Sequence, residues 1–372
     1  MAGVPRLFLA IATVIALAAA AAIPPPEDAP LDLDEAELRE LFGQQDIFAL
    51  PAGEIPEAPV EQQPEEDPEQ PQEDAFILGT SKPLGQISGL GITSKGHLLA
   101  FHRAEREWTE ESFSKDFKFN AHTGMIANAT IAVIDPANGQ VVAEHGKNQF
   151  YLPHGLTVDH EDNIWVTDVG AHQVVKMDKN FKVLMTLGEK LVPGTDEKHF
   201  CKPTDIAVAS NGYFFVADGY CNSRVLKFNA KGQFVDIVGS EMDPFIIPHS
   251  IALIEDLNLL CVADRENERV QCFSAGLKEG HRSIPAGIPI TSADDIGRVF
   301  AIRERAHYLV GVTGVDQQDS LEPQVFAMDM DTGKAQTYLK GIENGHALAI
   351  SKDGTVYVAH MNPNQIVGLN LA

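Results

Sequence analysis

Residues 152–168 read LPHGLTVDHEDNIWVTD, and related stretches recur twice further along the chain. The second copy, at 202–218, reads KPTDIAVASNGYFFVAD, and the third covers residues 247–264. The prolines that mark the three copies, at positions 153, 203 and 248, are 50 and 45 residues apart. Repeats of this length that contain several short strands are typical of β-propeller blades.

The first of these repeats shows how a blade would be built. It contains four β-rich runs separated by short polar turns, at residues 155–159, 163–169, 173–178 and 183–188. Four antiparallel strands make one blade, and a single blade cannot bury both of its faces, so blades must stack in a ring. The repeat therefore predicts an all-β propeller.

The units number six. Residues 86–146 resemble a first blade, three clear repeats follow, a degenerate fifth lies at 295–340 and a sixth at 343–371. We expect Phe76-Ile77-Leu78 to close the ring by pairing with the last blade. A six-bladed propeller domain is therefore predicted over residues 76–372.

Two segments of different composition precede this domain. Residues 7–22 are 16 uncharged positions that end in small residues, alanines 20–22 among them. This predicts a signal peptide over 1–22, since a membrane-spanning helix needs roughly 20 apolar residues. Residues 23–75 hold 17 acidic residues, one basic residue and 10 of the 22 prolines. This composition predicts a disordered linker or pro-segment. We expect a secreted, soluble monomer.

The charge of the chain excludes some classes of function. It has 372 residues, with 28 Lys and Arg against 53 Asp and Glu, and a formal charge of −25. Binding to nucleic acid or to an anionic membrane needs a basic surface, so neither is expected. The chain also has no nucleophile-elbow, zincin, P-loop or dinucleotide-binding motif, which disfavours serine hydrolysis, zincin proteolysis and nucleotide chemistry.

The chain has four cysteines, all within the predicted propeller. An even number behind a signal peptide suggests two disulfides, and four cysteines allow three pairings. We favour the local pairs Cys201–Cys221 and Cys261–Cys272, which close short loops, over a zinc cluster, since no Cys-x-x-Cys spacing occurs. The sequon Asn128-Ala129-Thr130 predicts N-glycosylation at Asn128.

Three histidines occupy the same position in alternate units. His154, His249 and His346 are 95 and 97 residues apart, which is two blades each. Alternate blades of a six-fold ring stand about 120° apart, and the first strand of each blade lines the channel. The three imidazoles should therefore converge on the axis, as in a catalytic zinc site with an open position. Histidines are often structural, but the intervening repeat has Thr204 here, so the repeat does not require histidine.

Three further residues are predicted at the same end of the channel. Arg103, Tyr220 and Arg265 follow the second strands of blades one, three and four. The two guanidinium groups suit a carboxylate of the substrate. We expect a divalent metal ion and the two arginines nearby to lower the pKa of Tyr220, so that the tyrosine can act as a general base.

Residues 85–372 resemble the peptidyl-α-hydroxyglycine α-amidating lyase family, which is built on NHL-type propeller repeats. The matching stretches include FHR at 101–103, GKNQFYLPHGL at 146–156, HFCKPTD at 199–205, DGYCNSR at 218–224 and CVADREN at 261–267. The resemblance implies a lyase that splits peptidyl-α-hydroxyglycine into an amidated peptide and glyoxylate. It also implies that a separate copper monooxygenase supplies the substrate.

The resemblance also implies roles for single residues. The zinc ligands would be His154, His249 and His346. Tyr220 would be the catalytic tyrosine, Arg103 and Arg265 the active-site arginines, and the disulfides would be the local pairs given above. A structural calcium would be held by the carbonyls of Leu90 and Leu156 and by one aspartate carboxylate.

The sequence departs from the family at the third histidine. Residues 344–347 read Asn-Gly-His-Ala, where the family has Met-Pro-His-Asp, so Ala347 replaces the calcium carboxylate. We therefore expect calcium to be weak or absent unless another acid substitutes. Two other functions stay open: a propeller that binds peptides or proteins without catalysis, and a calcium-dependent lactonase-like hydrolase. The second would need acidic ligands in the channel.

Overall fold

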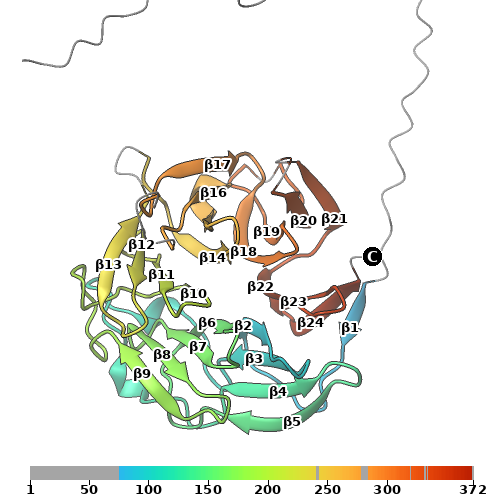
Figure 1. The fold of residues 1–372 in the computed structure, drawn as a ribbon. Helices are drawn as coiled ribbons and strands as arrows, with labels where there is room; N and C mark the ends of the chain where they lie inside the picture. The colour runs from blue at the N-terminus through green and yellow to red at the C-terminus, as the bar shows by residue number, and fades with distance from the viewer. Residues whose placement is uncertain are drawn as a thin grey trace, which may run out of the picture. The chain divides into compact units, whose positions relative to one another are not determined.

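The computed structural model describes residues 75–239, 243–277, 284–318, 320–330, 332 and 334–370. The predicted signal peptide over 1–22, and residues 23–74 of the predicted acidic segment, lie outside this part of the chain. The described residues form six four-stranded antiparallel sheets that stand as blades around a central axis (Figure 1). The predicted six-bladed propeller is confirmed.

Blades one to five take their strands in chain order from the axis outward (Figure 1). Blades one to three are β2 (Ile87–Ile92), β3 (Leu98–His102), β4 (Ile131–Asp135) and β5 (Gln140–His145); β6 (Pro153–Val158), β7 (Ile164–Asp168), β8 (Gln173–Met177) and β9 (Val183–Leu187); and β10 (Asp205–Val208), β11 (Phe214–Asp218), β12 (Arg224–Phe228) and β13 (Phe234–Val238).

The second half of the ring has the same organisation. Blades four to six are β14 (Pro248–Ile254), β15 (Leu259–Asp264), β16 (Arg269–Ser274) and β17 (Pro289–Ala293); β18 (Arg298–Arg305), β19 (Tyr308–Gly314), β20 (Gln324–Asp329) and β21 (Ala335–Lys340); and β22 (Gly345–Ile350), β23 (Thr355–Met361) and β24 (Asn364–Asn370), completed by β1 (Phe76–Leu78). Within the described residues, three short 3-10 helices lie in loops, at Glu110–Ser112, Ala121–Thr123 and Arg265–Asn267.

Strand β1 closes the ring. It pairs antiparallel with β24, with Phe76 opposite Gly368, Ile77 opposite Val367 and Leu78 opposite Ile366. The last blade is therefore built from both ends of the propeller sequence. The predicted closure by residues 76–78 is confirmed.

The outermost strand of each blade is the most exposed. All five residues of β7 are buried, because the neighbouring blades cover both faces of this strand. In the outermost strand β5, exposed residues alternate with half-buried ones. Apolar side chains of adjacent blades, such as Phe101 and Leu156, pack together in shared clusters. The core is thus a series of layers between blades.

A buried aspartate at the end of the second strand fixes the start of the first strand in three blades. The Asp168 carboxylate accepts hydrogen bonds from the backbone N–H groups of Tyr151 and Leu152, at 2.6 and 2.8 Å. Asp218 accepts one from Cys201 at 2.7 Å, and Asp264 one from Ile246 at 2.7 Å. These repeated carboxylates are structural, and they hold the segments that lead to the channel.

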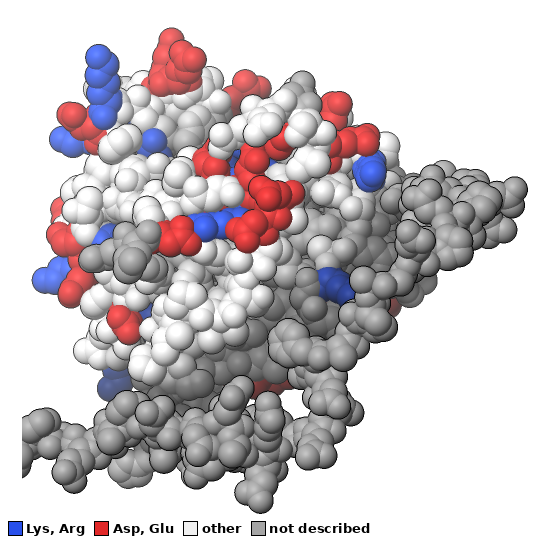
Figure 2. Space-filling model, turned by 90° about the horizontal axis from the view of Figure 1, so that it is seen from above, with Lys and Arg blue, Asp and Glu red and all other residues white. Residues whose placement is uncertain are grey.

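Both predicted disulfides are present, Cys201–Cys221 and Cys261–Cys272. The second joins the neighbouring strands β15 and β16. Asn128 of the sequon is exposed, and its side-chain amide donates to Glu105 at 3.1 Å. In the described residues, no helix has the length and apolar composition that crossing a membrane requires. Acidic and basic side chains are interspersed on the face of these residues that Figure 2 presents.

Candidate functional site

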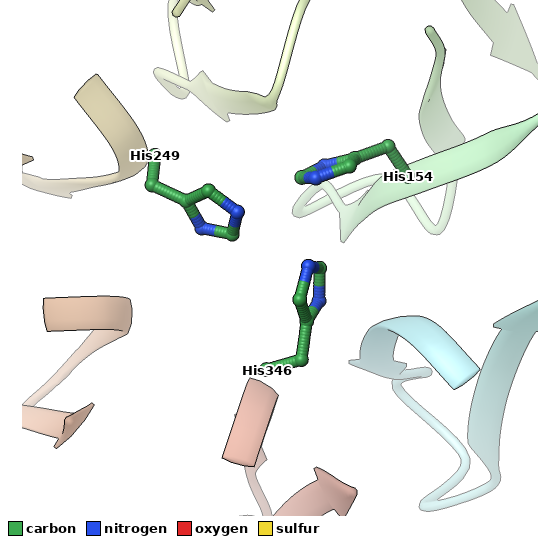
Figure 3. Close-up of side chains that lie close together, drawn as sticks. All are labelled: His154, His249 and His346. Atoms are coloured by element: carbon green, nitrogen blue, oxygen red, sulfur yellow. The ribbon is translucent and has the colours of Figure 1, made fainter. Parts of the chain in front are cut away.

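Three imidazoles meet on the propeller axis (Figure 3). His154, His249 and His346 come from the innermost strands β6, β14 and β22 of blades two, four and six. Their ring centroids are 4.9, 4.9 and 4.8 Å apart. One nitrogen from each ring lies within 4.8 Å of the other two, and all three side chains are buried. The predicted convergence is confirmed.

A β-bulge aims each histidine into the channel. The pairing registers of β6, β14 and β22 each shift at the histidine, so that this residue has no directly opposed partner on the second strand. The inner strands of blades one and five shift at the equivalent points, Ser88 and Phe300. An unpaired bulge residue turns its side chain and its backbone groups out of the regular ladder. The bulges therefore shape the site.

Each histidine is oriented by a carbonyl of the next blade. The Nδ1 atoms of His154, His249 and His346 lie 2.8, 2.6 and 3.0 Å from the carbonyl oxygens of Thr204, Phe300 and Ser88, respectively. A carbonyl only accepts hydrogen bonds, so Nδ1 carries the proton in every ring. The Nε2 lone pairs are then free to bind a metal ion.

Burial keeps the three rings neutral. It lowers the pKa of His154 to about 3, helped by the charge of Arg103. Burial also holds the pKa of His249 and the pKa of His346 well below the usual value for histidine. A metal ion that enters this site has no protons to displace at neutral pH, and neutral imidazole is a preferred ligand of zinc.

The hydroxyl of Tyr220 lies beside the three histidines. It is 2.9 Å from Nε2 of His154 and 3.0 Å from Nε2 of His249. Burial raises the pKa of Tyr220, and this effect outweighs the opposing charges of Arg265 and Arg103. Both arginines favour the phenolate, as expected, but without a metal ion burial has the larger effect on this pKa. A phenolate at this position would need the additional charge of a metal ion.

The two predicted arginines lie near Tyr220. The guanidinium carbon of Arg265 is 5.5 Å from the centre of the Tyr220 ring and 5.0 Å from that of Phe300. Its Nε donates to a carboxylate oxygen of Glu266 at 2.7 Å. Burial lowers the pKa of Arg103 to about 10, so Arg103 remains charged at neutral pH. The Nε of Arg103 donates to the carbonyl of Pro153 at 3.1 Å, next to His154.

Trp108 lies close to His154, Tyr220 and Arg103, although the sequence around it carries no distinct signal. It lies in the loop between β3 and β4, and its ring is 5.0 Å from the Tyr220 ring and 6.4 Å from the His154 ring. The guanidinium carbon of Arg103 is 5.2 Å from its centre. Trp108 therefore forms an aromatic wall of the site. Its short separation from Arg103 along the chain is the one clue that the sequence offers.

The departure at Asn344 leaves the histidine geometry intact. Asn344 has a backbone φ of 58°, in the left-handed region that asparagine tolerates. Its side-chain amide donates to the carbonyl of Asn362 at 2.8 Å. His346 still reaches Ser88, as described above, so the change at position 344 alters the surroundings of the ligand and not its orientation.

The predicted calcium position does not suit a calcium ion. Leu156 and Ala347 line a narrow axial hollow together with the three histidines. Ala347 offers no oxygen ligand from its side chain, and the Nη2 of Arg303 donates to the Leu156 carbonyl at 3.3 Å. A cation bound between Leu90 and Leu156 would compete with this guanidinium for the carbonyl. The expectation of weak or absent calcium therefore agrees with the residues present.

Comparison with known proteins identifies close relatives. The NHL repeat model matches residues 150–177, 200–228 and 245–273. The chain is 55% identical over 309 residues to the probable peptidyl-α-hydroxyglycine α-amidating lyase of Caenorhabditis elegans, covering 82% of this chain and 87% of the relative. It is 42% identical over 299 residues to the rat (Rattus norvegicus) peptidylglycine α-amidating monooxygenase, covering 76% of this chain and 30% of the rat protein.

Solved structures support the fold. A gluconolactonase from Xanthomonas campestris superposes with a TM-score of 0.55 at 11% sequence identity, covering 82% of this chain and 91% of that protein. At this identity the likeness shows the propeller architecture alone.

Proposed function

Because the chain belongs to the peptidyl-α-hydroxyglycine α-amidating lyase family, we propose that it carries out the family's reaction at the three-histidine site, with zinc as the metal. As a member of this family it is a lyase of the second step of peptide amidation. The substrate is a peptide that ends in α-hydroxyglycine, and the products are the peptide amide and glyoxylate.

The observation that carries the zinc proposal is the convergence of three buried, neutral imidazoles with unprotonated Nε2 atoms. Three histidine ligands and one open position suit catalytic zinc. When bound, zinc would supply Lewis-acid stabilisation of negative charge on a substrate oxygen. The hydrogen bonds from Nδ1 to backbone carbonyls hold the rings in place before any ion arrives.

The residues around the histidines supply the remaining functions. In our proposal, Tyr220 accepts the proton of the substrate hydroxyl as a phenolate, which the charge of a bound metal ion would favour, and its oxygen lies 2.9 and 3.0 Å from Nε2 of His154 and His249. Arg265 and Arg103 bind the substrate carboxylate. The hydroxyl oxygen becomes the aldehyde oxygen of glyoxylate as the N–Cα bond breaks. The bond electrons leave on the nitrogen, which gains a proton, so no water or redox partner is consumed.

The second part of the proposal concerns the source of the substrate and the cellular location of the protein. An α-hydroxyglycine terminus arises by oxidation of a glycine-extended peptide, and relatives of this chain include longer proteins named as monooxygenases. We assign that oxidation to a separate copper monooxygenase. The two disulfides fit an oxidising compartment, which favours the secretory pathway and secretion.

The hydrolase alternative has little support in the channel. A calcium-dependent lactonase would need free carboxylates near the axis. Asp205 lines the axial hollow, but its carboxylate is paired with Arg303 at 2.8 Å. Only a measurement of turnover distinguishes the lyase from a propeller that binds peptides or proteins without catalysis.

Product analysis tests the lyase function. The purified full chain, loaded with zinc, is mixed with α-hydroxyhippurate, and glyoxylate and benzamide are measured over time. We expect both products to form in equal amounts. Tight binding of the substrate without release of either product would instead identify a non-catalytic binding protein.

A further inference from the structure

One arginine occupies the axial hollow next to the histidines. Arg303 lies on β18, three residues after Phe300. The hollow is lined by Leu156, Asp205, Ser250 and Ala347 as well. Each of these residues, Arg303 included, follows a site residue of its own blade by one to three positions.

The guanidinium of Arg303 is enclosed by acceptors from four blades. Its Nη1 donates to the Asp205 carboxylate at 2.8 Å, to Ser250 Oγ at 3.0 Å and to the carbonyl of the adjacent residue Ile302 at 2.8 Å. Its Nη2 lies 3.3 Å from both the Leu156 carbonyl and the second Asp205 oxygen. One group therefore connects blades two, three, four and five.

The Asp205 carboxylate is fully used in the same network. It accepts the Ser250 hydroxyl at 2.7 Å and the backbone N–H of Ile251 at 3.2 Å, besides Arg303. Its side chain is 4% exposed, and that of Arg303 is 19% exposed. A buried carboxylate without a countercharge is strongly unfavourable, so Asp205 requires a cation at this position.

The network also reaches two of the three histidines. Asp205 directly follows Thr204, whose carbonyl accepts the Nδ1 proton of His154. Ser250 directly follows His249. Arg303 thus anchors the backbone beside one histidine and the backbone that orients another.

We propose that the Arg303 guanidinium is the resident cation of the axial hollow, in place of a bound metal ion, and that it is a positioning residue for His154 and His249. The guanidinium neutralises the charge of Asp205 and donates to the carbonyl of Leu156. Ala347 leaves space for the guanidinium, because its side chain carries no carboxylate. The chain then requires no calcium at this position. The calcium part of this proposal is independent of the lyase reaction. The positioning role rests on the zinc site proposed for the three histidines, and zinc affinity tests it separately from turnover.

The first test uses the unmodified, zinc-loaded full chain. Its thermal unfolding is followed with and without 1 mM calcium, at constant ionic strength. We expect no change in Tm. A site with a dissociation constant about a hundredfold below the added calcium would raise Tm by roughly 4 °C. A rise of that size overturns the proposal.

The second test rebuilds a metal site. The double variant Arg303→Ala/Ala347→Asp removes the guanidinium and adds a carboxylate beside the Leu156 carbonyl and Asp205. We expect calcium to raise the Tm of this variant and to leave that of Ala347→Asp alone unchanged, because Arg303 still occupies the hollow there. An equal response of both variants, or of neither, contradicts the proposal.

The third test addresses positioning. Zinc dissociation constants are measured by competition with a chromophoric chelator for Arg303→Met and Arg303→Lys. We expect Arg303→Met to weaken zinc binding by about 10- to 100-fold, as for other groups that orient metal ligands. Arg303→Lys should recover part of the affinity because it keeps the charge. An affinity within twofold of the unmodified chain in both variants would refute the positioning role.

Discussion

The position of one proton on each imidazole determines what the channel can bind. The hydrogen bonds from Nδ1 to the carbonyls of Thr204, Phe300 and Ser88 leave the three Nε2 atoms unprotonated. Burial removes the competing charged state. The site is therefore a preorganised set of neutral nitrogen donors.

Tyr220→Phe tests the base at the scale of one atom. The variant lacks the hydroxyl that lies 2.9 Å from His154 and 3.0 Å from His249. Since the histidines remain, we expect kcat to fall by about 10²- to 10⁴-fold with zinc content unchanged. Steady-state kinetics and metal analysis of the same sample provide the measurement. Loss of zinc from this variant would instead make Tyr220 a structural part of the metal site.

The positions of single residues could be predicted from sequence where those residues recur at the repeat spacing. The two-blade spacing of His154, His249 and His346 was enough to predict their convergence. The arginines favour the Tyr220 phenolate as predicted, but the opposing effect of burial on its pKa cannot be read from the motif. Trp108 was missed because it lies in the loop between β3 and β4, outside the repeated segments.

At the scale of elements, the bulges of the inner strands build the site. A regular strand would pair His154, His249 and His346 in the ladder and direct them along its faces. The bulges at Ser88 and Phe300 have the complementary effect, because they free carbonyls that orient His346 and His249.

Gly155→Ala tests the close approach of β6 to blade three. A Cβ at this position would lie 2.3 Å from the Thr204 carbonyl oxygen that orients His154. We expect a loss of stability of about 1–3 kcal/mol from overpacking together with weaker zinc binding. Gly79→Ala is the matched control, because a Cβ there meets no atom within 4 Å. Denaturant unfolding and zinc competition are the measurements. Equal behaviour of both variants would contradict this interpretation.

The sequence predicted which segments form blades and could not predict their local irregularities. The blade boundaries follow from hydrophobic runs and turn residues, which are local signals. A bulge depends on how two strands pair, and the contact of Arg303 with Leu156 joins residues 147 positions apart. Such features depend on the closed ring, and a single sequence does not contain a local signal for them.

At the scale of the whole propeller, closure by β1 keeps the blades in place around the axis. Leu78 is 7% exposed and Ile77 is 65% exposed, although both belong to this strand. Leu78→Asp buries an unpaired carboxylate in the last blade, so we expect it to destabilise the propeller by about 2–4 kcal/mol. Ile77→Asp should have little effect. Thermal unfolding compares the two, and similar Tm values would show that this strand does not stabilise the ring.

Buried neutral histidines make the stability of the metal-free chain depend on pH. Burial holds the folded pKa of His154 at about 3 and lowers those of His102 and His172 to about 4. In the unfolded chain these residues bind protons near pH 6.5. The unfolded state therefore binds more protons between pH 6.5 and these lower values.

We accordingly expect full stability above pH 6.5 and a progressive loss as pH falls toward 4, with up to about 1.4 kcal/mol per pH unit from each such histidine. Thermal unfolding of the metal-free chain at pH 7.5, 6.0 and 5.0 measures this. A Tm that stays constant or rises over this range would show that the rings are protonated in the folded state.

The central claim is that one zinc ion, held by histidines of alternate blades, is required for lyase activity. The most direct test is a zinc titration of the metal-free chain in which bound zinc and glyoxylate release are measured in the same samples. We predict that the rate rises in proportion to bound zinc and saturates at one ion per chain, and that His249→Ala neither retains zinc nor releases glyoxylate. Full activity without zinc, or an active His249→Ala variant with normal zinc affinity, would contradict the account.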